Sequence, residues 1–336
     1  MEKEKQPLLK INNLKTTFST YKGELSAVDG VSLELNEGEI LGIVGESGCG
    51  KSVTAESILQ LLDENTTTYD GEIIFNGKNL LKSSNRELEE IRGNEISMIF
   101  QDPMSSLNPV ITIGKQIAES VRIHQKLSKK ESMKKAVELL RLTGIPSPEQ
   151  RVKEYPHEIS GGMRQRVMIA MALSCQPKLL IADEPTTALD VTIQEQILKL
   201  MLQFQKELNM GIVLITHDFG VVANYCTKVA VMYLGQVIEE TDVKSLFSRP
   251  LHPYTVGLIN SVPQLDGDRS KELATIKGVV PSLTQIPKGC RFAPRCPLAT
   301  EKCLEEMPNL ESAKENHQVR CWHYEKVLEG ELQYVN

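Results

Sequence analysis

Apolar runs alternate with amphipathic stretches along most of the chain. Residues 191–208, VTIQEQILKLMLQFQKEL, place apolar side chains at helical spacing and predict a helix. Five other segments have the apolar runs and turn signals of buried strands; they are residues 31–45, 71–80, 95–101, 178–183 and 211–217. Strands that alternate with helices predict an α/β sheet with parallel members.

Two regions depart from this pattern. Residues 112–158 are polar, rich in lysine and without a strand-like run, which predicts a helical insertion between two parts of the α/β core. From about residue 255 the pattern weakens into turn- and proline-rich segments, and four of the seven cysteines follow. Because 336 residues are many for one core, we expect one large domain with an appendage, or two domains.

The segment GIVGESGCGKS, residues 42–52, has the spacing of a phosphate-binding loop. It follows an apolar strand and precedes a helix-compatible stretch, which is the context that separates this motif from a ligand-free glycine turn. Its glycines let backbone N–H groups surround phosphates, and the helix N-terminus adds positive potential. Lys51 would reach the β- and γ-phosphates, and the Ser52 hydroxyl would bind Mg²⁺. Cys49 suits the loop as a small residue, although an accessible thiol there would be reactive.

Three later segments carry further groups that suit a nucleotide site. An apolar strand ends at Asp183 and Glu184, where one carboxylate can hold Mg²⁺ and the next can polarise the attacking water. EISGGMRQR, residues 158–166, places serine and two glycines before a helix, a second N-terminus that can bind phosphate. His217 ends another strand. Each has a structural alternative, such as a helix cap or a structural histidine, but their order and spacing together favour nucleotide chemistry.

Together these motifs resemble the ATP-binding cassette (ABC) family over about residues 8–250. Methionine at 163 and isoleucine at 159 depart from the family's Leu-Ser-Gly-Gly-Gln signature, but the phosphate contacts come from serine and backbone, so we expect activity to persist. The matching motifs are Walker A (Gly45, Glu46, Ser47, Gly48, Cys49, Gly50, Lys51, Ser52, with Val53 next), the Q-loop (Phe100, Gln101), the signature (Ser160, Gly161, Gly162), Walker B with the catalytic glutamate (Asp183, Glu184), the D-loop (Ala188, Leu189, Asp190) and the switch histidine (His217).

The resemblance implies a fold and a division of the chain. The fold is an α/β P-loop NTPase (RecA-like) core with an antiparallel β subdomain and a helical insertion, plus a small cysteine-rich C-terminal extension. The implied nucleotide-binding domain covers residues 1–255, with its helical subdomain at about 102–165, and the extension covers residues 256–336.

The resemblance also implies a mechanism in which two such domains pair head to tail and enclose ATP. Glu184 would be the base, Gln101 would sense Mg²⁺, and His217 would hold the γ-phosphate. Tyr21 is the candidate for stacking on adenine, with Phe18 as its competitor. The other implied groups are the Mg²⁺ ligands Ser52, Gln101 and Asp183, and the signature residues Ser160, Gly161 and Gly162, which would contact the partner's ATP.

Charge and composition narrow the biological setting. The net charge of −6 lacks the basic footprint of a nucleic-acid binder. No apolar run approaches the length of about 18 residues that a membrane span needs, and the N-terminus has no secretory pattern. Only 58 residues separate Gln101 from Ser160, without heptads, which disfavours the soluble DNA-repair relatives. The single P-loop disfavours the ribosome-associated relatives, and the glutamate and histidine disfavour a non-hydrolysing cassette.

Within transporters, the chain resembles the ATPase subunits of dipeptide and oligopeptide importers. The segments that carry this resemblance are QDPMSSLNP, YPHEISGGMRQRVMIAMAL, LHPYTVGLINSVP and GCRFAPRCP. It implies a second ATPase subunit that is a homologous but different chain, two transmembrane permease subunits and, indirectly, an extracytoplasmic peptide-binding protein. It also implies a peripheral position on the cytoplasmic face of the membrane. Relatives in this group that move nickel or other small solutes leave the substrate open.

The C-terminal cysteines are spaced Cys290-x5-Cys296-x6-Cys303-x17-Cys321. A disulfide is disfavoured in a reducing compartment, and structural zinc sites usually begin with a tighter pair. Four thiolates on an irregular segment suit a 4Fe–4S cluster, and some members of the resembled family carry one at this motif. Zinc and four unliganded cysteines remain the alternatives. His317 and His323 flank Cys321 and could replace a ligand, but we expect them at the surface.

Overall fold

The protein is described here from a computed structural model that covers residues 6–21, 23–102, 106–186, 190–262 and 275–332. The chain forms two compact units. The first contains residues 1–8, 35–40 and 75–215, and the second contains residues 9–34, 41–74 and 216–336. No helix in the described part of the chain is long and apolar enough to span a membrane.

The first unit is built on three parallel strands in the order β8, β7, β6. Leu179 of β7 lies opposite Ile96 of β6 on one side and Gly211 of β8 on the other. Every residue of β7 and β8 is buried, as expected for parallel strands that are covered on both faces. The bounds are β6 Ile96–Ile99, β7 Leu179–Asp183 and β8 Gly211–Thr216.

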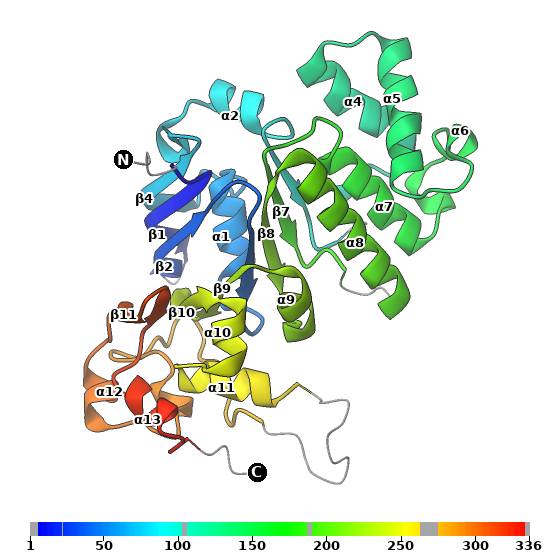
Figure 1. The fold of residues 1–336 in the computed structure, drawn as a ribbon. Coiled ribbons are helices and arrows are strands. Elements are labelled where there is room, and N and C mark those ends of the chain that lie inside the picture. Colours follow the sequence, from blue (N-terminus) through cyan, green and yellow to red (C-terminus); the bar gives the residue numbers. More distant parts are fainter. Residues whose placement is uncertain (1–5, 22, 103–105, 187–189, 263–274, 333–336) are drawn as a thin grey trace, which may run out of the picture. The chain divides into compact units, whose positions relative to one another are not determined.

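Helices make up most of the rest of the first unit, and α4, α5 and α7 pack on one another (Figure 1). A capping box of Ser128 and Glu131 begins α5, which satisfies two backbone N–H groups at that end. Helix α8 has the predicted bounds. The elements are β5 Lys78–Asn79, η1 Leu80–Lys82, α2 Asn85–Ile91, α4 Ile113–Gln125, α5 Lys129–Leu142, α6 Pro148–Arg151, η2 Pro156–Glu158, α7 Gly161–Ala172 and α8 Val191–Leu208.

The second unit contains strands in the orders β2-β1-β4 and β3-β9-β10-β12-β11. Strand β3 runs parallel to β9, whereas the pairs β9–β10, β10–β12 and β12–β11 are antiparallel. The bounds are β1 Leu9–Thr20, β2 Gly23–Leu35, β3 Ile40–Val44, β4 Thr67–Phe75, β9 Lys228–Tyr233, β10 Gln236–Asp242, β11 Glu311–Lys314 and β12 His317–Val319.

Short helices complete the second unit, and several contribute to one apolar core with β9 and β10. Tyr233, Tyr254 and Phe292 are among the largest side chains in this core. The helices are α1 Lys51–Ile58, α9 Phe219–Tyr225, α10 Val243–Ser248, α11 Pro253–Asn260, η3 Ala293–Arg295, α12 Glu301–Glu305 and α13 Tyr324–Leu328.

The C-terminal region is joined to this core rather than set apart from it. Strand β12 adds to the sheet beside β10, with Val319 opposite Glu239. Phe292 packs in the same cluster as Val231 of β9. Residues 275–332, drawn in orange and red in Figure 1, therefore share a compact unit with the predicted phosphate loop.

Candidate nucleotide-binding site

The predicted phosphate loop connects β3 to α1, and three glycines with positive φ shape it. These φ angles are 154° at Gly45, 78° at Gly48 and 99° at Gly50. A Cβ at Gly45 would lie 2.3 Å from the carbonyl oxygen of Met232, and one at Gly50 would lie 2.6 Å from that of Ala27. Only glycine fits these two positions. A Cβ at Gly48 would meet nothing within 4 Å, so this part of the loop is open.

The lysine of the loop points back into it. Lys51 is 5% exposed, and its Nζ donates to the carbonyl oxygens of Gly45 at 2.8 Å and Glu46 at 3.1 Å. A buried ammonium needs such oxygen partners, and the phosphate oxygens of a nucleotide would supply better ones. Cys49 is 1% exposed, and burial raises the pKa of its thiol. It is therefore a packing residue, and the accessible, reactive thiol considered from the sequence is not observed.

Glu46 is held by two residues that the sequence analysis did not identify. Its backbone N–H donates to the Tyr254 hydroxyl at 2.9 Å. Its carboxylate accepts hydrogen bonds from both terminal nitrogens of Arg295, at 2.7 and 3.1 Å. The only feature of the sequence that could have drawn attention to Arg295 is its place as a charged residue between two cysteines.

Two of the predicted catalytic residues meet in the first unit. Asp183 is 4% exposed at the end of β7, and Glu184 follows it with a positive φ of 44°. The Glu184 N–H donates to the Ile215 carbonyl at 3.0 Å, which fixes the turn. Gln101 Nε2 donates to Glu184 Oε2 at 3.0 Å. The residue expected to sense Mg²⁺ thus directly contacts the residue expected to act as base.

The signature residues form the exposed N-terminus of a twelve-residue helix, α7. Ser160 is its N-cap and accepts a hydrogen bond from the Met163 N–H at 3.4 Å. A Cβ at Gly161 would meet nothing within 4 Å, and one at Gly162 would lie 3.4 Å from Ile193 Cγ2. Packing within the chain therefore does not require glycine at 161, which is consistent with a contact to another molecule.

Each of the other predicted site residues that the structure describes lies at the end of an element or in a turn. His217 follows β8 directly and is exposed. Asp190 caps α8, where its Oδ1 accepts from the Ile193 N–H at 3.0 Å; Ala188 and Leu189 of the D-loop lie outside the described residues. Tyr21 lies in the turn between β1 and β2 and is 93% exposed. Its stacking on adenine stays a prediction.

The four C-terminal cysteines line one small cavity, together with aromatic and apolar side chains that include Phe292 and Trp322. Burial raises the pKa values of Cys296 and Cys321 to about 12. Among the described residues, no group of three or more His, Cys, Asp or Glu side chains is placed to hold a metal ion. The cysteines converge on one space without forming a finished metal site.

The two histidines near Cys321 differ from each other. His317 was expected at the surface but is 4% exposed, because its Nε2 lies 2.8 Å from the buried Glu239 carboxylate. His323 lines the cysteine cavity, and its Nε2 lies 3.0 Å from the Thr300 hydroxyl.

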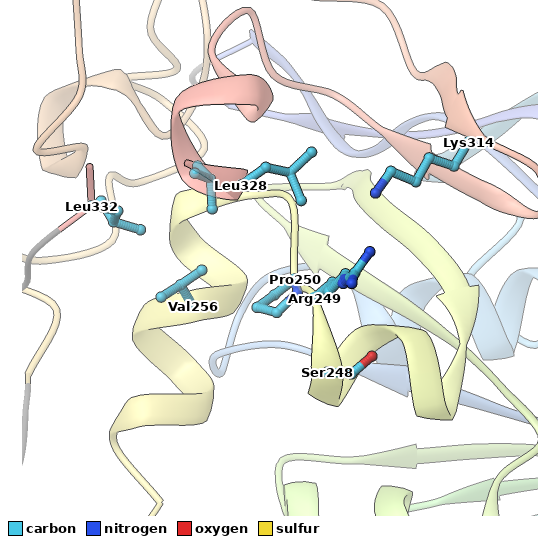
Figure 2. Close-up of a pocket in the computed structure, with 8 residues that line it drawn as sticks. Ser248, Arg249, Pro250, Val256, Lys314, Leu328 and Leu332 are labelled. Atoms are coloured by element: carbon cyan, nitrogen blue, oxygen red, sulfur yellow. The ribbon is translucent and has the colours of Figure 1, made fainter. Parts of the chain in front are cut away.

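A separate pocket is lined by residues from 248–256 and from 314–332 (Figure 2). Arg249 and Lys314 supply positive charge on one side, and Val256, Leu328 and Leu332 supply apolar surface on the other. It contains none of the predicted nucleotide or cysteine residues.

A glycine-shaped loop between a buried strand and a helix, with its lysine turned inward, defines a P-loop nucleotide-binding protein. The ABC transporter family matches residues 28–187, and the family "Oligopeptide/dipeptide transporter, C-terminal region" matches residues 238–303. The chain belongs to the ABC transporter family, and it is an ATPase of that family.

Individual relatives match nearly the whole chain. A probable peptide ABC transporter ATP-binding protein, y4tR of Sinorhizobium fredii, is 54% identical over 96% of this chain and 96% of its own length. The oligopeptide transport ATP-binding protein AppD of Bacillus subtilis is 53% identical over 95% of this chain and 97% of its own. A dimeric post-hydrolysis structure of the ATP-binding cassette MJ0796, bound to ADP and Pi, is 29% identical with a TM-score of 0.64, over 70% of this chain and 98% of that one.

Proposed function

We propose that this chain is the ATP-hydrolysing subunit of a membrane transporter that imports dipeptides or oligopeptides. The observation that carries the substrate class is the similarity, over about 95% of the chain, to ATP-binding proteins named for peptide transport. The match of residues 238–303 to a peptide-transporter C-terminal region supports it independently of the ATPase motifs.

In the proposed mechanism, the chain binds ATP through its phosphate loop and closes on a second ATPase chain. Lys51 leaves the carbonyl oxygens of Gly45 and Glu46 and binds the β- and γ-phosphates. Glu184 accepts a proton from the attacking water while Gln101, its hydrogen-bond partner at 3.0 Å, keeps the carboxylate oriented. His217 binds the γ-phosphate, and Tyr21 stacks on the adenine.

The side chains to which we assign Mg²⁺ have donor groups that suit this ion. Hydroxyl, amide and carboxylate oxygens are the ligands that this ion prefers, and Ser52, Gln101 and Asp183 supply one of each. Mg²⁺ would neutralise charge on the β- and γ-phosphates during transfer to water.

The exposed signature helix supports the proposed head-to-tail pairing. Ser160, Gly161 and Gly162 form the N-terminus of α7, where backbone N–H groups have no partner within the helix and the helix potential is positive. The partner's γ-phosphate would bind there. Asp190 would lie at the same interface. Two permease subunits would hold the pair at the cytoplasmic face of the membrane, with an extracytoplasmic protein delivering the peptide.

A second part of the proposal concerns the division of the chain and its cysteines. We assign residues 1–255 to the nucleotide-binding domain and 256–336 to the extension. Cys290, Cys296, Cys303 and Cys321 would hold a 4Fe–4S cluster, with zinc as the alternative. What supports this is the donor set: the four cysteines line one cavity, and thiolates are the ligands of such clusters. The backbone N–H of His323 donates to Cys321 Sγ at 3.3 Å, a kind of contact that tunes the potential of a bound cluster. The metal would link the parts of the chain that carry these four cysteines.

Two experiments test these proposals. A strain that lacks this gene is complemented with wild type or with Glu184→Gln, and uptake of a labelled dipeptide, a labelled pentapeptide and Ni²⁺ is measured. We expect wild type, but not the variant, to restore peptide uptake; restored Ni²⁺ uptake alone would overturn the substrate class. For the cysteines, protein purified without oxygen should contain about four irons and four sulfides per chain. Protein with one zinc ion per chain would support the zinc alternative instead of the cluster. Protein without metal would reject both proposals.

A further inference from the structure

An arginine in the part of the chain that carries the C-terminal cysteines contacts the phosphate loop. Arg295 directly precedes Cys296, and its side chain is only 4% exposed. Both of its terminal nitrogens donate to the Glu46 carboxylate, at 2.7 and 3.1 Å. Its guanidinium carbon lies 5.9 Å from the ring centre of Tyr233 and 6.0 Å from that of Phe292. A two-pronged ion pair of this kind fixes orientation as well as distance.

Glu46, in turn, links this arginine to the loop lysine. Its carboxylate binds Arg295, its N–H donates to Tyr254, and its carbonyl oxygen accepts from Lys51 at 3.1 Å. Three separate groups of one loop residue, its carboxylate, its N–H and its carbonyl, therefore have a partner. Movement of the Glu46 side chain would shift the backbone that the Lys51 ammonium contacts.

The segment that carries Arg295 is itself anchored. Phe292 packs edge-on against Tyr233 and Tyr254, with ring centres 5.3 Å apart in both pairs. Arg291 forms a partly buried ion pair with Asp29 and donates to the carbonyl oxygen of Leu234. The packing of Phe292 and the ion pair of Arg291 hold the segment on which Arg295 lies. This segment can therefore serve as a support for the phosphate loop.

We propose that Arg295 is a positioning residue for ATP binding, which acts through Glu46 to hold the phosphate loop and Lys51 in the arrangement that accepts a nucleotide. The inference rests on the proposed role of the loop. A methylene chain in place of the guanidinium would leave the Glu46 carboxylate without its charged partner, and the loop would sample other arrangements. We expect ATP affinity to fall at least tenfold, with a smaller change in the maximal hydrolysis rate.

Arg320 provides a matched control. It also directly precedes one of the four cysteines, and burial lowers its pKa from the ordinary value. It donates to the carbonyl oxygens of Val237 and Pro308, each at 3.0 Å, and both of these partners lie outside the phosphate loop. Arg320→Met should disturb the C-terminal region without reaching Glu46.

The experiment measures the Kd of a fluorescent ATP analogue, the KM and kcat for ATP, and the melting temperature of the full-length variants. Arg295→Met should raise Kd and KM at least tenfold, whereas Arg320→Met should change them less than twofold, even if both melt earlier. Arg295→Lys keeps the charge but lacks the two-pronged geometry, so it should give an intermediate Kd and remains informative if the methionine variant does not fold. Equal weakening by Arg295→Met and Arg320→Met would overturn the inference.

A double variant tests whether the effect passes through Glu46. Glu46→Gln removes the same ion pair, so Glu46→Gln with Arg295→Met should bind ATP no more weakly than the weaker single variant; multiplied losses would contradict the proposal. Failure of the proposed function is distinguishable, because wild type would then bind no ATP or Lys51→Ala would bind it normally. If wild type binds ATP, Lys51→Ala does not, and both Arg295 variants bind like wild type, only the role of Arg295 is wrong.

Discussion

Gly161 offers a test in which fold stability and pairing should respond in opposite directions. It is the first residue of α7, its side-chain position is open, and the first turn of α7 contains no acidic residue. In Gly161→Asp, the new carboxylate would lie at a helix N-terminus, where a negative charge typically stabilises by about 0.3–1 kcal/mol. The folded chain should therefore be as stable as wild type or slightly more stable.

The same carboxylate should oppose the partner's ATP. If the signature faces a γ-phosphate, the two negative charges would lie about 4–6 Å apart, and their repulsion at an effective dielectric constant of about 20 is roughly 3–4 kcal/mol per phosphate charge. That repulsion corresponds to a loss of about two to three orders of magnitude in ATP-dependent pairing. In Gly161→Asn, the new side chain is nearly isosteric with aspartate but uncharged. The difference between the two variants therefore isolates the effect of the charge.

The assay is sedimentation of each variant in the Glu184→Gln background, with and without ATP, beside thermal unfolding. The partner is this chain itself or its homologous ATPase chain. We expect Gly161→Asp to unfold at or above the parent's melting temperature and to form no ATP-dependent dimer, and Gly161→Asn to retain more pairing. A Gly161→Asp protein that pairs as tightly as its parent would refute the placement of the signature at the nucleotide.

Two further predictions concern the second unit. Because Cys49 is buried and its thiol pKa is raised, iodoacetamide at pH 8 should modify it only after unfolding, as peptide mass spectrometry would show; rapid modification of the folded protein would contradict its burial. Phe292 is 1% exposed among three aromatic side chains, so Phe292→Ala should lower the free energy of unfolding in urea by about 3–5 kcal/mol, and a loss below about 1 kcal/mol would contradict the packing described.

The sequence predicted the elements whose signal is local. Residues 178–183 and 211–217 were predicted as strands because parallel strands buried on both faces are continuously apolar, and they form β7 and β8. Helix α8 was predicted with its observed bounds because its apolar spacing lies within one continuous segment. The phosphate loop could also be predicted, because its backbone geometry requires glycine at fixed intervals.

Contacts between distant segments could not be predicted in this way. Arg295 lies 249 residues from Glu46, and Tyr254 lies 208 residues from it, so no local pattern joins them to the loop. His317 was expected at the surface because nothing nearby in sequence reveals Glu239, 78 residues away. The pairing of β12 with β10 also joins segments that are distant in the sequence. It explains why the C-terminal region looked irregular in the sequence yet belongs to a sheet.

The most direct test of the account is ATP binding and hydrolysis by Glu184→Gln beside wild type. The substitution keeps the size of the side chain but removes the carboxylate that Gln101 contacts at 3.0 Å. We expect the variant to bind ATP as wild type does and to hydrolyse it at least about 100-fold more slowly, the loss typical of a missing general base. Turnover at the wild-type rate would contradict the assignment of Glu184 as the base and the mechanism built on it.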